Sequence, residues 1–403
     1  MGRVTKPAPC ESRRTRTNAD MRGSKTVPSA CVSVCPDTLV FHSALCKVAL
    51  KALHYDLFFS RMRDYMSDQI ERISEVVPGI FRIIVQIPIP EVGSMNSYVI
   101  VRGDRNLMVD PGMAHPECYE QLEKSIEDLG LDLGRTDFFI THHHLDHFSS
   151  VSRFLRETSR IYISRPEAEF IDRVASGEVE SETGVFLEML GFPEKNPMNV
   201  VSQFYSDEYR KQSHWPFHCV ADGDVIMQGS YGFSCMITSG HTIGHSCLYE
   251  TSRSVLISGD QITAGIQFLL DRANPLADHL QSLARLREMD VKLVLPGHGS
   301  PFRDHRKRID QLLAHHQGRS EAVYGALGKN GKDAYEVTLA LDGQLPDRDS
   351  LDNVPLIRKF IHTRHTFAYL QHLVAQGKAR KERRHGRILF FLPQLTELDQ
   401  RKR

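Results

Sequence analysis

The sequence predicts an α/β fold, in which short apolar strands alternate with amphipathic helices. Two observations support this class. Strand-like runs at residues 106–110, 137–141 and 160–164 are separated by helical patterns such as that of residues 116–129, and this alternation buries a sheet between layers of helices. In addition, five strand-like runs lead into histidine or aspartate. We therefore expect a sheet that carries polar side chains along one rim.

The first 66 residues differ in composition from the rest of the chain. Their beginning is polar and basic with scattered proline and serine, and such a composition buries too little apolar surface to offset chain entropy. Charged residues interrupt the apolar stretch at 39–65, which excludes a spanning helix of about 20 apolar residues. We expect a disordered or poorly ordered extension over residues 1–66, with an organelle-targeting segment as the alternative.

The bulk composition constrains the partners and the compartment. Lysine plus arginine equals aspartate plus glutamate at 50 each, so no global charge favours nucleic acid or a membrane surface. The eight cysteines form no C-x-x-C pair, which predicts reduced thiols and a cytoplasmic location. We interpret Cys247 as a small buried residue on a strand.

The main domain is predicted over residues 67–302 and opens with antiparallel strands. Residues 80–88 and 97–101 are rich in β-branched and aromatic residues, and Pro90 and Gly93 lie between them. This spacing is typical of a β-meander.

Four histidines and one aspartate lie within the six residues His142–His147. They follow the apolar run 137–141, and residues 148–155 have helical spacing with serines near the start, so the cluster is predicted on a strand-to-helix turn. Imidazole nitrogen and carboxylate oxygen are ligands of zinc or iron. A lone histidine would indicate only a polar loop, but this density predicts a metal site.

Further histidine and aspartate side chains are predicted at the ends of other strands. These strands cover residues 106–110, 233–238, 254–258 and 292–296, and they lead to Asp110, His241, Asp260 and His298. A glycine lies close to each of these residues, and glycine allows the backbone to turn sharply or to approach a site closely.

These motifs resemble those of the metallo-β-lactamase-fold hydrolase superfamily. The pattern H-x-H-x-D-H covers residues 142–147, G-H-T-x-G-H covers 240–245, G-D covers 259–260 and G-H-G covers 297–299, in family order over about residues 80–301. Ser239 and Ile243 stand where prolines are frequent, which removes no ligand. The resemblance implies a four-layer αβ/βα sandwich with its site where the strands end.

The resemblance also implies a role for each motif residue. His142, His144 and His241 would hold one metal ion, and Asp146, His147 and His298 would hold a second, with Asp260 bridging the pair. His143 and His245 would support the ligands or face solvent, and Asp110 would orient a ligand histidine.

Residues 166–210 form an insertion that the motifs do not explain. Helical patterns cover 167–175 and 182–190. The insertion is interpreted either as a lid, with an apolar substrate pocket, or as helices that pack onto the sandwich. The side chains assigned to the pocket are Phe186, Met189, Leu190, Phe192 and Met198.

A second module is predicted over residues 303–396, before a charged tail at 397–403. Three helical patterns at 303–328, 334–341 and 355–376 precede a hairpin at 378–392, and this order resembles the winged-helix module of one branch of the superfamily. The hairpin is basic, through Lys378, Arg380, Lys381, Arg383, Arg384 and Arg387. It could contact phosphates, but the balanced global charge favours a solvated hairpin that packs beside the rim.

The resemblance predicts a hydrolase with two divalent ions, zinc in the first place, with iron or manganese as alternatives. The ions would share a water, lower its pKa to roughly 7, and let it attack an ester, thioester or lactone, while Asp146 and Asp260 position this nucleophile. The expected partner is a small-molecule substrate, and no membrane partner is expected. Whether the protein forms a homodimer stays open. The alternatives are RNA or phosphodiester cleavage, a persulfide dioxygenase with one iron and, more distantly, a non-enzymatic binding role. No residues match those that contact glutathione in glyoxalase II, so that activity is not carried over.

Overall fold

The computed structural model describes residues 72–89, 92–196, 215–270, 274–342, 351 and 354–393, all within one compact unit, Glu71–Arg403. The predicted extension at 1–66, the charged tail at 397–403 and Met198 lie outside the described residues. The domain boundaries given above stay predictions.

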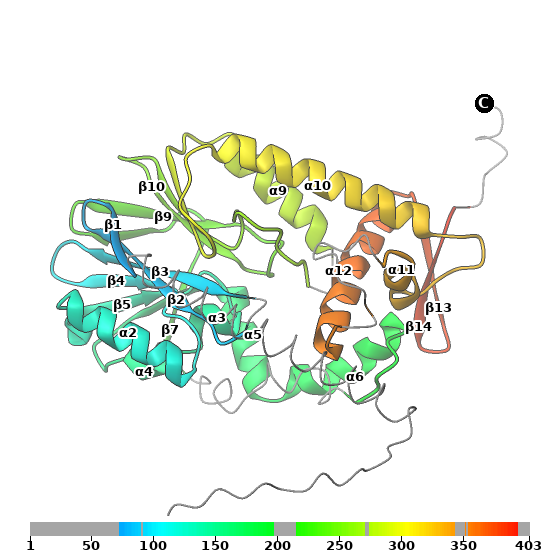
Figure 1. Cartoon of the computed structure of the whole chain (residues 1–403), viewed down its shortest axis with the longest axis horizontal. Helices are drawn as coiled ribbons and strands as arrows, with labels where there is room; N and C mark the ends of the chain where they lie inside the picture. The colour runs from blue at the N-terminus through cyan, green and yellow to red at the C-terminus, as the bar shows by residue number, and fades with distance from the viewer. Residues whose placement is uncertain are drawn as a thin grey trace, which may run out of the picture. The chain divides into compact units, whose positions relative to one another are not determined.

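Two large sheets lie on the left of the unit in Figure 1. The first sheet has the order β1 to β7, antiparallel up to β4 and parallel from β4 to β7. Its strands are β1 Ile73–Val77, β2 Ile80–Gln86, β3 Ser94–Val101, β4 Asn106–Val109, β5 Thr136–Phe139, β6 Ile161–Ser164 and β7 Phe217–Val220.

The second sheet has the order β12-β11-β10-β9-β8, antiparallel except for the parallel pair of β11 and β12. Its strands are β8 Val225–Gln228, β9 Tyr231–Ile237, β10 Ser246–Glu250, β11 Val255–Gly259 and β12 Leu293–Pro296. Cys247 is buried on β10, as predicted.

Helices cover the outer faces of both sheets (Figure 1). Helices α2 (Pro116–Asp128) and α4 (Val151–Phe154) pack on the first sheet, and α9 (Pro275–Arg287) and α10 (His305–Ala326) pack on the second. Between the sheets, Tyr98 and Ile100 of β3 meet Phe233 of β9, while Val99 of β3 faces α2. This alternation is the two-residue period of a strand that is buried on both faces, and it confirms the predicted αβ/βα layers.

The turn after β5 differs from the prediction. A single helix was expected over 148–155, but the chain forms two short helices, α3 (Leu145–Phe148) and α4. The hydroxyl of Ser150 donates to Pro111 O and that of Ser149 accepts from Ala114 N. These contacts tie the intervening serines to the loop after β4, so the helix is interrupted, and Asp146 and His147 lie within α3.

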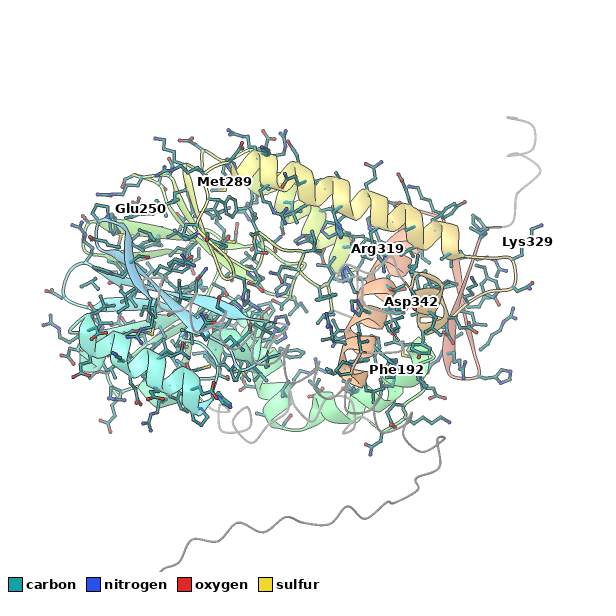
Figure 2. The ribbon with its side chains drawn as sticks, in the orientation of Figure 1. Phe192, Glu250, Met289, Arg319, Lys329 and Asp342 are labelled. Carbon is teal, nitrogen blue, oxygen red and sulfur yellow. The ribbon has the colours of Figure 1, made fainter. Side chains whose placement is uncertain are left out.

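The insertion packs on the C-terminal helices. Its helices are α5 (Arg165–Ala175) and α6 (Glu178–Leu190). Phe186 contacts Phe367. Phe192, which is labelled in Figure 2, contacts Tyr335 and Phe360. Leu190 lies in the same core and Met189 packs against it. This packing accounts for their burial, and their assignment to a substrate pocket stays a prediction.

The C-terminal region has the predicted order of three helices and a hairpin. After α10 come α11 (Ala334–Ala340), α12 (Leu356–Ala375), β13 (Arg380–Arg384) and β14 (Arg387–Phe391). Whether the C-terminal elements form a winged helix stays a prediction.

In the first sheet, a 3₁₀ turn at Leu133–Arg135 precedes β5. Among the described residues, no helix combines the length and the apolar character that crossing a membrane requires.

Candidate metal centre

The seven predicted ligands converge at the ends of strands from both sheets. Three overlapping groups have their ligand atoms within 4.8 Å of one another: His142, His144 and His241; His142, His147 and Asp260; and Asp146, His147 and His298. The first sheet supplies the residues that follow β5, and the second supplies those that follow β9, β11 and β12.

The first histidine trio is compact. His142 Nε2 lies 3.0 Å from His144 Nδ1, and His241 Nε2 lies 3.3 Å from His142 Nε2 and 3.0 Å from His144 Nδ1. Tetrahedral coordination at about 2.0–2.1 Å requires ligand nitrogens about 3.3 Å apart. The spacing of this trio therefore fits a single ion.

The second trio contains the carboxylate of Asp146. His298 Nε2 lies 3.2 Å from His147 Nε2 and 3.3 Å from Asp146 Oδ2, and His147 Nε2 lies 3.7 Å from the same oxygen. The side chains of His298 and Asp146 are 19% and 20% exposed, whereas that of His147 is fully buried. The second trio is therefore the part of the centre that solvent reaches more easily.

Asp260 lies between the two trios. Its Oδ1 is 3.6 Å from Nε2 of both His147 and His298, and its Oδ2 is 3.6 Å from His241 Nε2. Oδ1 is buried and has no hydrogen-bond partner. An unpaired buried carboxylate oxygen carries a large desolvation cost, which a bound cation offsets. The residues thus fit a pair of divalent ions with Asp260 in contact with both.

Gly297 gives Asp260 the space it occupies. A Cβ atom at position 297 would lie 2.6 Å from Asp260 Oδ1 and 2.9 Å from His147 Cε1. Only glycine allows the backbone after β12 to come this close to the centre.

Backbone carbonyls fix the orientation of two of the predicted ligand histidines. His241 Nδ1 lies 3.0 Å from Phe268 O, and His298 Nδ1 lies 2.8 Å from Ser94 O. A carbonyl only accepts, so each Nδ1 carries the proton and each Nε2 presents its lone pair to the centre. A ligand histidine in metal sites commonly has its second nitrogen held in this way.

Asp110 fixes the orientation of two more of the predicted ligand histidines, His147 and His142. Its Oδ2 accepts from His147 Nδ1 at 2.8 Å and from Thr141 Oγ1 at 2.7 Å, and its Oδ1 accepts from Thr141 N at 2.8 Å. The Thr141 hydroxyl, which donates to Asp110, in turn accepts from His142 Nδ1 at 2.9 Å. One carboxylate thereby orients a histidine of each trio.

Glu167 is a buried residue of the site that the sequence interpretation missed. Its Oε2 accepts from His143 N at 2.8 Å and from His143 Nδ1 at 2.5 Å, and its Oε1 accepts from Thr242 Oγ1 at 2.7 Å and Gly244 N at 2.6 Å. It therefore joins the His142–His147 turn to the loop of His241. The available signal was its position in the first turn of a helix that follows a rim-directed strand.

His245 contacts the backbone of Asp260 and does not face solvent. Its Nε2 accepts from Asp260 N at 3.1 Å, and its Nδ1 donates to Thr238 Oγ1 at 2.8 Å. His143 is likewise buried, through the contact with Glu167 and a stacked ring contact with Phe170.

β3 holds the loop of His298, through contacts that the sequence interpretation also missed. Asn96 Nδ2 donates to Pro296 O and Gly299 O at 2.8 and 2.7 Å, and the Tyr98 hydroxyl donates to Pro296 O at 2.8 Å. These bonds join the two sheets beside the second trio.

The electrostatics of the centre favour positive charge near the carboxylates. Burial and the neighbouring histidines lower the pKa of His142 well below 6.5. Burial also lowers the pKa of His147, but Asp260, Asp146 and Asp110 raise it by more, to about 9. The same opposition raises the pKa of His298 to about 10. Carboxylates that stabilise a proton on these rings would stabilise a metal cation in the same position.

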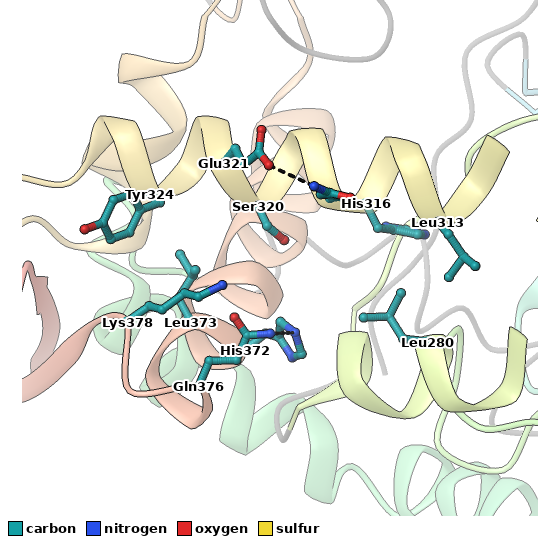
Figure 3. A pocket seen from close by; sticks show the side chains of 11 residues that line it. Leu280, Leu313, His316, Ser320, Glu321, Tyr324, His372, Leu373, Gln376 and Lys378 are labelled. Atoms are coloured by element: carbon teal, nitrogen blue, oxygen red, sulfur yellow. Dashed lines mark hydrogen bonds between the residues drawn. The ribbon is translucent and has the colours of Figure 1, made fainter. Parts of the chain in front are cut away.

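A separate cavity of about 570 Å³ lies between α9, α10 and the end of α12 (Figure 3). Its lining combines apolar and polar side chains, and none of the seven predicted ligands is among them. The lining residues are Leu280, Leu313, His316, Gln317, Ser320, Glu321, Tyr324, His372, Leu373, Gln376 and Lys378. Two hydrogen bonds, Gln317 to Glu321 and Gln376 to His372, already use polar groups of its wall.

Comparison with known proteins identifies the family of this chain. A family model described as the metallo-beta-lactamase superfamily matches residues 90–298, just over half of the chain. The probable metallo-hydrolase YqjP of Bacillus subtilis is 26% identical over 280 residues, which cover 63% of this chain and 83% of that protein. The acyl-coenzyme A thioesterase MBLAC2 of Homo sapiens is 28% identical over 226 residues, which cover 53% of this chain and 76% of that protein.

A solved structure extends the similarity over most of the described residues. The metallo-beta-lactamase family protein TTHA1429 from Thermus thermophilus superposes with a TM-score of 0.66 at 25% identity, covering 79% of this chain and 100% of that chain. With the family model and the His and Asp ligand groups, this shows that the chain belongs to the metallo-beta-lactamase superfamily.

Proposed function

We propose that the protein is a hydrolase that uses two zinc ions to cleave thioesters. The observation that carries the proposal is the position of Asp260, whose two carboxylate oxygens face different ligand trios and one of which is buried without a partner. His142, His144 and His241 would hold one ion, Asp146, His147 and His298 the other, and Asp260 would bridge them.

The donor set supports zinc over harder ions. Five imidazoles and two carboxylates, without a thiolate, suit zinc or iron, whereas magnesium prefers oxygen ligands alone. Iron and manganese are the alternatives, and metal analysis of the purified protein distinguishes the three.

The chemistry follows from the position of the protein groups. Two divalent ions in this site would lower the pKa of a water molecule and polarise the carbonyl oxygen of a substrate. Carboxylate oxygens of Asp146 and Asp260 lie 3.3 and 3.6 Å from His298 Nε2, where they would orient the attacking water and accept its proton. The partly exposed side chains of Asp146 and His298 mark the side from which a substrate would approach.

The proposed substrate class rests on a relative and on the C-terminal hairpin. The relative named as an acyl-coenzyme A thioesterase supports a thioester among the carbonyl substrates. The basic hairpin gives little support to RNA cleavage, because Glu382 pairs with both Arg380 and Arg384 and Arg387 pairs with Asp333. Arg380 also lies over the ring of Phe391. Three cations of the hairpin, those of Arg380, Arg384 and Arg387, therefore already have partners within the protein.

The second trio argues against the one-iron dioxygenase alternative. That chemistry would use only His142, His144 and His241. The close grouping of His147, His298 and Asp146, oriented by Asp110 and Ser94, would then have no use.

A substrate panel on metal-quantified protein tests the proposal. The substrates are an acyl-coenzyme A thioester, a lactone, bis-p-nitrophenyl phosphate and a short RNA. Thioester turnover is expected to fall by more than about 100-fold in His144→Ala and Asp260→Ala, because each removes several kcal/mol of transition-state stabilisation. His218→Ala, which changes an exposed histidine of β7, is the matched control and retains turnover. Cleavage of RNA without thioester turnover would contradict the proposal, as would full activity in Asp260→Ala.

A further inference from the structure

The loop that follows Asp260 supports a ligand of the first trio. Residues 262–270 run from the end of β11 toward α9, and the carbonyl of Phe268 accepts the proton of His241 Nδ1 at 3.0 Å. The direction of this carbonyl therefore decides which nitrogen of His241 is free to bind an ion. Among the described residues, His241 Nδ1 makes no other hydrogen bond.

Helix α12 of the C-terminal region holds this loop on both sides of the carbonyl. Leu269 N donates to His365 Nδ1 at 3.0 Å, and the Arg364 guanidinium donates to Leu270 O. The ring of Phe268 makes edge contacts with the rings of His362 and His365, with centroids 5.3 and 5.2 Å apart. The contacts thus run from α12, through residues 268–270, to His241.

The bond between His365 and Leu269 is the most direct of these contacts. It restrains the peptide group whose oxygen binds His241, since Leu269 N and Phe268 O belong to the same peptide unit. His365 is 1% exposed and Leu269 is fully buried, so water cannot replace a lost acceptor. Leaving a buried N–H without a partner costs about 1–3 kcal/mol, which is enough to reorient this peptide.

The side chain of His365 has one defined tautomer in this arrangement. Because Nδ1 accepts from Leu269 N, the proton lies on Nε2, and Nε2 is buried without a partner. The hydrogen bond at Nδ1 therefore fixes the imidazole, and the ring otherwise packs against Phe268 and Tyr369.

We propose that His365 is a positioning residue of the first metal site, and that it acts on His241 through the peptide between Phe268 and Leu269. This proposal rests on the proposed metal centre. It makes α12 part of the site, so that a region far from the family motifs along the chain sets the affinity of one of the two ions.

Two amide variants test the proposal in the full-length protein. Asn places an amide oxygen close to the position of His Nδ1, whereas Gln places its amide close to Nε2. His365→Asn therefore keeps an acceptor for Leu269 N, and His365→Gln removes it at a similar cost of polar burial. Tyr369→Phe is the matched control. Tyr369 lies on α12 with His365, and the variant deletes its buried hydrogen bond to His316 of α10 without changing a residue that contacts the loop.

The measurement is the stepwise affinity for zinc by competition with a chromophoric chelator, together with the visible spectrum of the cobalt-substituted protein. In His365→Gln, the affinity for one of the two zinc ions is expected to fall by at least tenfold, and the cobalt bands are expected to change. Loss of an outer hydrogen-bond partner typically costs about 10–100-fold in metal affinity. His365→Asn stays within about threefold of wild type, and Tyr369→Phe binds both ions as wild type does.

The outcomes separate this proposal from the function on which it rests. Two unchanged affinities in His365→Gln would overturn the role of His365 and leave the metal centre intact. Equal losses in the Gln and Asn variants would overturn it as well, because the position of the acceptor would then not matter. A wild-type protein that binds no zinc would instead contradict the proposed zinc centre.

Discussion

Glu167 shows how single buried residues assemble this site. Four hydrogen bonds from the two ligand loops end on its carboxylate, which is fully buried. Burial raises the pKa of Glu167, but the His143 imidazole and the hydrogen bonds from His143, Thr242 and Gly244 lower it by more, so that it lies below 4.5. The carboxylate therefore remains charged in the folded protein at neutral pH.

Glu167→Gln is expected to lower the free energy of unfolding of the metal-free protein by about 2 kcal/mol at neutral pH. The reason is that the charged carboxylate becomes a neutral amide, and one of its two accepting oxygens becomes an NH₂ group that can only donate. The effect depends on pH. A carboxyl with a depressed folded-state pKa stabilises the protein above its unfolded-state pKa, and this stability is lost as the pH falls. Urea unfolding between about pH 7 and 3 should show the wild-type and variant curves converging below about pH 4.5. Parallel curves over the whole range would contradict this role.

The sequence predicted the residues that belong to motifs and missed those that depend on tertiary contacts. The seven proposed ligands, Asp110 and His245 lie in short patterns whose chemistry is readable without a structure. Glu167, Asn96 and His365 act through partners between 24 and 203 residues away along the chain. No local pattern marks such residues, because their function exists only after the strands and helices have packed.

At the scale of elements, Asp333 joins α11 and β14 of the C-terminal region to the turn after α6 of the insertion. It caps α11 by accepting from Glu336 N at 2.9 Å, and Glu336 accepts from Asp333 N in return. Its Oδ2 also pairs with Arg387 of β14 at 3.2 Å. The turn after α6 packs directly on it, since a Cβ at Gly191 would overlap the Asp333 carboxylate.

Asp333→Ala should lower the free energy of unfolding by about 2 kcal/mol, from the lost cap and the lost ion pair. Asp333→Asn is the control, because its amide oxygen still accepts from Glu336 N and should restore more than half of the loss. Chemical denaturation measures both variants. An unchanged midpoint in Asp333→Ala, or a loss of bound zinc in the folded variant, would contradict a purely structural role.

Elements with clear periodicity were predictable, and some of the short ones were not. The helical spacing of α2, α10 and α12 places these helices within a few residues of their observed bounds. Strands β1, β7 and β8 were missed, whereas the equally short β4, β5, β6 and β12 were predicted from their apolar runs. The division of one expected helix into α3 and α4 depends on hydrogen bonds to the loop after β4, which local spacing does not contain.

At the scale of the whole unit, the proposed centre lies where the two sheets meet. The first sheet leads to His142, His144, Asp146 and His147, and the second leads to His241, Asp260 and His298. The apolar core between the sheets sets their separation, so the distances within the trios depend on packing that is remote from them. Bound ions would in turn stabilise the joined sheets, because they bind the folded chain alone.

The measurement that tests the two-ion centre most directly is an anomalous difference map at the zinc edge, from crystals grown with zinc. Two peaks about 3.5–4 Å apart are predicted, one among the ligand nitrogens of His142, His144 and His241, and one among His147, His298 and Asp146, with an oxygen of Asp260 toward each. A single peak, or peaks away from these seven side chains, would contradict the account.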